Sequence, residues 1–137
     1  MRLIPEKTVS KPGIVGGMAK ILIVEDDEPV RDLAARALAR DGHDVETAED
    51  GEAGLALIQE AAGGFDLVVS DIRMPGMDGI AMAEAAVRQY PGLKIMLVTG
   101  YADQRERAEG LDKVIVDVVQ KPFTLSQIRE KVREHLA

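Results

Sequence analysis

A single carboxylate, Asp71, stands where an apolar strand would give way to a turn. It follows the strand-like run 67–70 and begins the sequence Asp-Ile-Arg-Met-Pro-Gly-Met-Asp-Gly. Other polar residues follow strand-like runs in a similar way: Glu25, Asp26, Thr99 and Lys121. In open α/β folds the carboxyl ends of parallel strands meet at one edge of the sheet, where ligands bind. We therefore expect an acid pair, a carboxylate, a hydroxyl and an amine to converge.

Three carboxylates brought together repel one another, and either a shifted pKa or a divalent cation relieves the repulsion. Ligands that are all oxygen favour Mg²⁺ over softer metals, and Mg²⁺ keeps several waters. A phosphoryl group can replace one water, with its other oxygens met by the Lys121 ammonium and the Thr99 hydroxyl. Asp71 is then the in-line nucleophile, and the implied product is an aspartyl phosphate.

The elements that must position these residues alternate along the chain. From Lys20 onward, short apolar runs alternate with segments of helical period, which is typical of βα units around a parallel sheet. We predict five strands, at 21–24, 43–47, 66–70, 95–98 and 114–119. We predict five helices, the first two beginning near Pro29 and Asp50 and the others covering 80–90, 102–111 and 124–137.

Two helices carry the clearest patterns. The first has an expected core face made of Val30, Leu33, Ala34, Ala37 and Leu38. In the last, Thr124 and Gln127 form a capping box, and the expected core face is Leu125, Ile128, Val132 and Leu136. The two histidines, His43 and His135, fall at a strand start and in the C-terminal turn, so we expect both on the surface and neither as a catalytic base.

Composition indicates one ordinary domain, because the chain has 137 residues, of which 46% are hydrophobic. The net charge of -7 and the presence of only two Phe and two Tyr argue against direct binding of nucleic acid. The chain has no cysteine, which fits a cytoplasmic location, and no apolar run long enough for a membrane. We expect residues 1–17 to form a flexible tail and 18–137 to form the domain.

Residues 20–137 resemble the receiver domain of a two-component response regulator. The resemblance rests on Val-Glu-Asp-Asp at 24–27, on Met-Pro-Gly-Met-Asp-Gly at 74–79 after Asp71, on Thr99, and on Lys-Pro-Phe at 121–123. It implies a doubly wound, flavodoxin-like α/β fold with a five-stranded parallel sheet in the order 2-1-3-4-5 and five helices.

The resemblance also implies residue roles and partners. Asp71 would accept a phosphoryl group from a histidine kinase or phosphotransfer protein, and this self-phosphorylation and later autodephosphorylation would be the only catalysis. Mg²⁺ would be bound by Glu25, Asp26, Asp71 and the backbone carbonyl of Arg73. Lys121 and Thr99 would contact the phosphoryl group. The output would be contact with a downstream protein, by a monomer or a weak phosphorylation-dependent dimer.

Two departures from the family pattern concern the switch. The residue three positions before Lys121 is Val118, where the family commonly has an aromatic residue. Tyr101, two residues after Thr99, offers another aromatic, with Gly100 as a flexible link. We therefore expect the segment 100–111, together with the face made by the last strand and helix, to change contacts on phosphorylation.

Each motif alone has an ordinary structural explanation, and only their joint order favours function. The run 25–27 is also what a helix N-terminus attracts, and an aspartate such as Asp71 is common in turns. A Mg²⁺-dependent phosphohydrolase is disfavoured because Arg73 stands where haloacid-dehalogenase-type enzymes need a second carboxylate. A phosphorylation-independent adaptor with the receiver fold is the remaining alternative.

Overall fold

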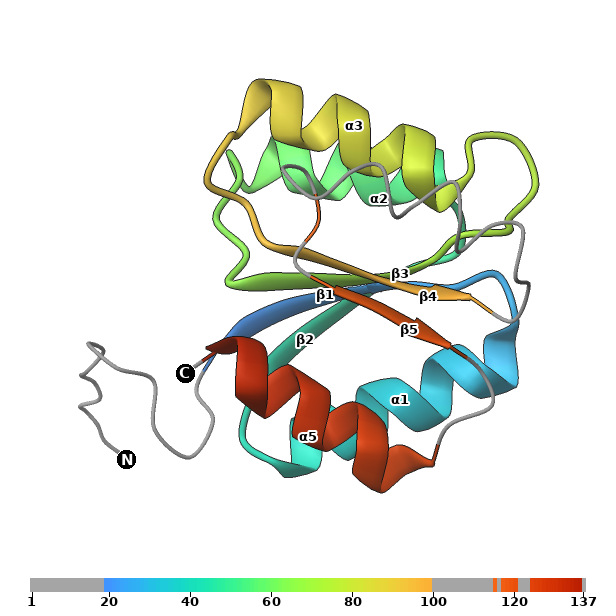
Figure 1. Cartoon of the computed structure of the whole chain (residues 1–137), viewed down its shortest axis with the longest axis vertical. Coiled ribbons are helices and arrows are strands. Elements are labelled where there is room, and N and C mark those ends of the chain that lie inside the picture. The colour runs from blue at the N-terminus through green and yellow to red at the C-terminus, as the bar shows by residue number, and fades with distance from the viewer. Residues whose placement is uncertain (1–18, 100–114, 116, 121–123, 137) are drawn as a thin grey trace.

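The computed structural model describes residues 19–99, 115, 117–120 and 124–136, which form a parallel sheet between two layers of helices (Figure 1). The strands are β1 (Lys20–Val24), β2 (Asp44–Ala48), β3 (Leu67–Asp71), β4 (Ile95–Thr99) and β5 (Asp117–Gln120). The helices within the described residues are α1 (Glu28–Arg40), α2 (Gly51–Glu60), α3 (Gly79–Gln89) and α5 (Leu125–Leu136). The strand order is β2-β1-β3-β4-β5, which confirms the expected flavodoxin-like topology. The helix predicted at 102–111 lies outside the described residues.

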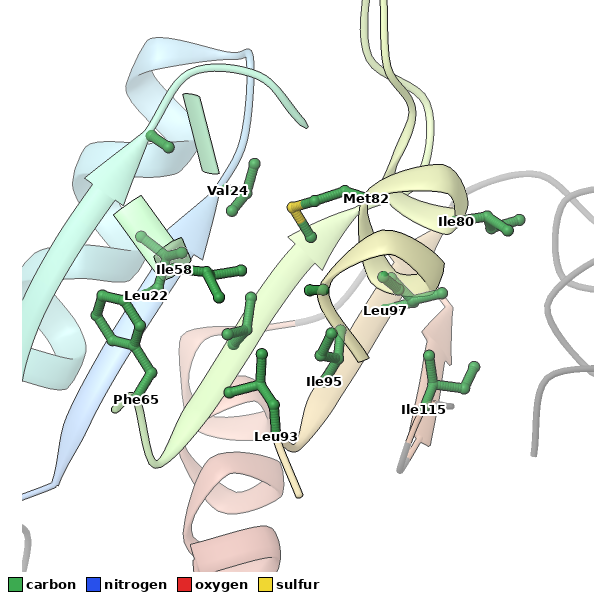
Figure 2. Close-up of a cluster of buried hydrophobic side chains, with 14 of the residues drawn as sticks. Leu22, Val24, Ile58, Phe65, Ile80, Met82, Leu93, Ile95, Leu97 and Ile115 are labelled. Atoms are coloured by element: carbon green, nitrogen blue, oxygen red, sulfur yellow. The ribbon is translucent and has the colours of Figure 1, made fainter. Parts of the chain in front are cut away.

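The helices cover the sheet in pairs, with α2 and α3 on one face and α1 and α5 on the other (Figure 1). Successive strand residues point to opposite faces, so a strand covered on both sides must be apolar throughout. Strand β1 obeys this rule. Leu22 and Val24 enter the core beneath α2 and α3, part of which Figure 2 shows, whereas Ile21 and Ile23 enter the core beneath α1 and α5.

Side chains close the N-termini of all four described helices. Asp27, Asp50 and Asp78 each accept a hydrogen bond from the backbone N–H three residues later, at 3.2, 2.7 and 2.8 Å respectively. The predicted capping box is present: Thr124 N–H donates to Gln127, and Gln127 N–H donates to the Thr124 hydroxyl. These caps fix where each helix starts relative to the strand before it.

The predicted core faces of α1 and α5 were partly wrong. Leu38 is buried, but Val30 is 37% exposed and Leu33 is 53% exposed. At 3.6 residues per turn, Leu33 lies about 140° around the helix from Leu38, and Val30 about 80°. On α5, Ile128 is buried, whereas Leu125, the first residue of the helix, is 42% exposed.

Both histidines were predicted to lie on the surface, and both are only partly exposed there. His43 is partly buried, and its Nδ1 accepts a hydrogen bond of 3.3 Å from the Ala19 N–H at the start of β1. Burial lowers the pKa of His43. His135 is also partly buried, with its Nε2 2.9 Å from Oδ2 of Asp117.

Candidate functional site

Three carboxylates from two neighbouring strands meet at the carboxyl edge of the sheet. Glu25 and Asp26 follow β1, and Asp71 is the last residue of β3. The register pairs Val24 with Ser70, so the next residues, Glu25 and Asp71, continue side by side. Each of the three acids offers an oxygen within 4.8 Å of the others. The convergence expected from the sequence is therefore present for these residues.

Burial distinguishes the three carboxylates. Glu25 is 6% exposed and Asp71 is 9% exposed, whereas Asp26 is exposed to solvent. A buried carboxylate loses hydration and requires hydrogen bonds or an opposite charge in compensation. The donors offered are all carboxylate oxygens, and one of them is open to solvent, which is the arrangement that suits a hydrated Mg²⁺. The residues present thus fit the Mg²⁺ that the sequence led us to expect.

Three hydrogen bonds hold Glu25 in place. Its N–H donates to the Ala48 carbonyl at the end of β2, at 3.0 Å. One carboxylate oxygen, Oε2, accepts from the Asp27 N–H at 3.1 Å. Its carbonyl accepts from Nη1 of Arg31 at 2.9 Å. The first acid of the site is therefore fixed at its amide, its carbonyl and its side chain.

The peptide around Asp71 is held from two directions. Oδ1 of Asp71 accepts from the Ile72 N–H at 2.9 Å, and the Ser70 hydroxyl donates to the Asp71 carbonyl at 2.8 Å. Gly79 packs so closely that a Cβ added to it would lie 2.1 Å from the Asp71 carbonyl oxygen. Only glycine permits this approach, and it lets the Gly79 N–H donate to Ile72 at 2.8 Å.

The remaining predicted site residues fall in different places. Thr99 ends β4 and is fully buried; because Asp71 pairs with Val98, Thr99 lies one position farther along the same edge. Arg73 is exposed, two residues after Asp71. Gly100, Tyr101 and Lys121 lie outside the described residues, so their predicted roles remain predictions.

The comparison with known families decides the identity of this fold. The sequence model of the response regulator receiver domain matches residues 21–133. The chain belongs to this family. Receiver domains are the phosphoacceptor domains of two-component signalling and pair with histidine kinases; they are not typically enzymes in their own right.

Relatives of this receiver domain are found in proteins of several kinds. The sensor kinase CckA of Brucella abortus is 35% identical over 131 residues, which cover 96% of this chain and 14% of CckA. The transcriptional regulatory protein TcrA of Mycobacterium tuberculosis is 35% identical over 88% of this chain and 47% of its own length. This receiver therefore spans less than half the length of these curated relatives.

Solved structures support the same fold for this receiver. The crystal structure of a CheY-like receiver domain protein from Methanospirillum hungatei matches with a TM-score of 0.79 and 34% identity, covering 87% of this chain and 94% of that one. Among the described residues, no helix combines the length and the apolar character that crossing a bilayer requires.

Sequence patterns alone did not identify several residues that shape the receiver site. Arg31 and Ser70 bond to backbone carbonyls, and Gly79 acts through a close contact. One signal for Arg31 was available, since it lies six residues after Glu25, near the expected start of the first helix. Asp78 is the N-cap of α3 and accepts a hydrogen bond from the Ala81 N–H.

Proposed function

We propose that Asp71 is the phosphoacceptor of this receiver. The supporting observation is the meeting of Glu25, Asp26 and Asp71 at the carboxyl edge, with oxygens within 4.8 Å of one another. In the proposed reaction, an Asp71 carboxylate oxygen attacks phosphorus as the bond to the donor's imidazole nitrogen breaks. The departing nitrogen keeps the electron pair, and the product is an aspartyl phosphate.

A bound Mg²⁺ would supply positive charge to the oxygens of the transferring group. We propose that Glu25, Asp26, Asp71 and the backbone carbonyl of Arg73 hold it. Burial of Glu25 and Asp71 supports this assignment, because a cation offsets the repulsion between neighbouring carboxylates. The hydrogen bond from Ile72 to Oδ1 orients the Asp71 carboxylate before a donor arrives.

The phosphoryl oxygens would be received by Thr99 and Lys121. Thr99 supports the proposal by its position at the same sheet edge as Asp71. We further propose that Gly100 and Tyr101 take part in the switch, because Val118 occupies the position where an aromatic residue is common. Val118 is only partly buried against the core of α2 and α3.

We propose a histidine kinase or phosphotransfer protein as the donor and a downstream protein as the target, with the receiver as a monomer or a weak phosphorylation-dependent dimer. We place the receiver domain at residues 18–137 and a tail at 1–17, in keeping with the family match over 21–133. A cytoplasmic location belongs to the same proposal.

The test is intact-mass spectrometry of the full chain after incubation with acetyl phosphate and Mg²⁺. We expect one phosphoryl adduct, absent with EDTA and absent in Asp71→Asn. Asp117→Asn is the matched control, because Asp117 is an aspartate at the opposite end of a strand, and it should keep the adduct. An adduct that persists in Asp71→Asn would refute the assignment.

If acetyl phosphate gives no adduct, transfer from a phosphorylated histidine kinase decides between the alternatives. Transfer to the wild type but not to Asp71→Asn supports a receiver with a strict donor requirement. No transfer from either donor favours the phosphorylation-independent adaptor. Multiple turnovers on a phosphate ester would favour the hydrolase, which the exposed Arg73 beside Asp71 does not support.

A further inference from the structure

Arg31 holds the loop between β1 and α1 through both its backbone and its side chain. It is the fourth residue of α1, and its N–H donates to the Asp27 carbonyl at 2.9 Å. Its side chain turns back toward the strand, where Nη1 donates to the Glu25 carbonyl at 2.9 Å. One residue thus contacts both ends of the segment 25–27.

The loop it holds is a closed circuit of hydrogen bonds. The Asp27 N–H donates to Oε2 of Glu25, and Oδ1 of Asp27 accepts from the Val30 N–H in the first turn of α1. The direction of the Glu25 carboxylate therefore depends on Asp27, whose own position depends on the helix start. Arg31 completes the circuit by tying that helix to the Glu25 carbonyl.

This circuit opposes the electrostatic repulsion among the acids of the loop. Glu25, Asp26 and Asp27 are consecutive acids, and two of them share the cluster with Asp71, so their mutual repulsion favours a spread loop. A bond from a guanidinium to a carbonyl is charge-assisted and stronger than a neutral one. Such outer-shell bonds orient metal ligands and thereby tune affinity for the metal.

We propose that Arg31 is a positioning residue for the cation site, an inference that rests on the proposed function. Its positive charge and its hydrogen bond act on cation affinity with opposite signs. The charge repels a cation, whereas the bond prepares Glu25 and Asp26 to bind one. The bond is made to the backbone of the ligand loop, and positioning is the larger effect.

The test compares Mg²⁺ affinity, by calorimetric titration of the full chain, for the wild type and three variants. Arg31→Met removes the charge and the donor, and should weaken Mg²⁺ binding on the order of tenfold. Arg31→Lys keeps the charge and an N–H donor of nearly the same reach, and should recover most of the affinity. Arg36→Met, an exposed arginine on the same helix, should match the wild type.

Thermal unfolding without Mg²⁺ and phosphorylation at varied Mg²⁺ separate positioning from a general loss of structure. For Arg31→Met we expect a higher half-saturating Mg²⁺ concentration but a near-normal rate of adduct formation at saturation. Unchanged Mg²⁺ affinity, with or without a lower unfolding temperature, would overturn the proposal. Tighter binding by Arg31→Met would overturn it too, since charge would then dominate.

The wild type tells failure of this inference apart from failure of the proposed function. If the wild type binds no Mg²⁺ and forms no adduct, both are wrong. If it binds Mg²⁺ and forms the adduct while Arg31→Met behaves identically, only the role of Arg31 is wrong.

Discussion

Among the residues that the structure describes, two groups of three potential metal ligands lie at opposite ends of the strands, and they differ in what holds them. The first is Glu25, Asp26 and Asp71 at the carboxyl edge of the sheet; the second is Asp117, Glu134 and His135, where the start of β5 meets the last turn of α5. Each group offers ligand atoms that lie within 4.8 Å of one another.

In the second group, a protein ammonium lies among the acids. Nζ of Lys131 is 3.3 Å from Asp117 and 3.5 Å from Glu134, and His135 is 2.9 Å from Asp117. Burial raises the pKa of Asp117, but the hydrogen bonds from His135 and Lys131 outweigh it, so that the pKa falls below its ordinary value. This group is an ion-pair network that joins β5 to α5.

In the first group, the contacts described above are largely to the backbone. The Asp27 and Ile72 N–H groups donate to Glu25 and Asp71, and Arg31 donates to a carbonyl. These backbone donors orient the carboxylates, whereas in the second group the Lys131 ammonium bridges two acids. The two groups offer the same number of potential ligands, so the nature of their anchors, and not that number, distinguishes them.

The largest effect that sharpens this comparison is on Mg²⁺ binding. Asp26→Asn removes the charge of a proposed ligand in the first group and should weaken Mg²⁺ binding by about two orders of magnitude, the upper end of the range for outer-shell partners. Glu134→Gln, the matched exposed acid in the second group, should leave it unchanged. The measurement is the rise in unfolding temperature with added Mg²⁺.

An equal loss in the two variants would mean that Mg²⁺ responds to net charge and not to the first group. A loss in Glu134→Gln alone would exchange the roles assigned to the two ends of the sheet.

The second effect is on the free energy of unfolding. It compares a glycine that has no room for a side chain with a glycine that has open space around it. A Cβ at Gly79 would meet the Asp71 carbonyl oxygen at 2.1 Å, whereas a Cβ at Gly92 would meet nothing within 4 Å. Gly79→Ala should cost about 2 kcal/mol or more, because backbone must move. Gly92→Ala should be neutral or stabilising by up to about 1 kcal/mol.

Urea denaturation at neutral pH measures both changes. The prediction for Gly79 fails if the two variants unfold at the same urea concentration. Retained phosphorylation in a destabilised Gly79→Ala would show that this contact supports the fold more than the geometry of Asp71.

Much of the fold could be predicted because burial on both faces makes strands apolar throughout. The strand predicted at 66–70 is Leu67–Asp71, and the helix predicted at 80–90 is Gly79–Gln89. The helix begins one residue earlier than predicted because its N-cap, Asp78, and not its first apolar residue, sets the start. The order of the strands came from the family resemblance, since periodicity does not encode it.

The candidate site was less evenly predictable. The convergence of carboxylates at strand ends could be predicted, because parallel register alone places Glu25 and Asp71 side by side. The roles of Arg31 and His135 could not be predicted, because each side chain bonds to a residue outside its own helix. The pattern of a helix does not reveal such a partner. Leu33 was predicted to be buried and is exposed. A helical repeat of apolar residues is compatible with several buried faces, and packing against the rest of the fold selects one of them.

The smallest effect concerns pH and the second group. The pKa of Asp117 is lowered in the folded state, so its charged form stabilises the fold above the ordinary aspartate value of 3.8. This contribution is lost as pH falls through the lowered pKa. Asp117→Asn should therefore reduce stability at pH 7, by less than about 1 kcal/mol because Lys131 is 42% exposed and salt screens the pair.

Urea denaturation of the wild type and Asp117→Asn between pH 7 and pH 3 measures this difference, and a carboxyl ¹³C titration gives the pKa of Asp117 directly. The stability difference should be constant above about pH 5 and should shrink below pH 4 as the carboxylate takes up a proton. A pKa at or above 3.8 would contradict the ion-pair description of this end of the sheet. The contrast between the two ends of the sheet would then disappear.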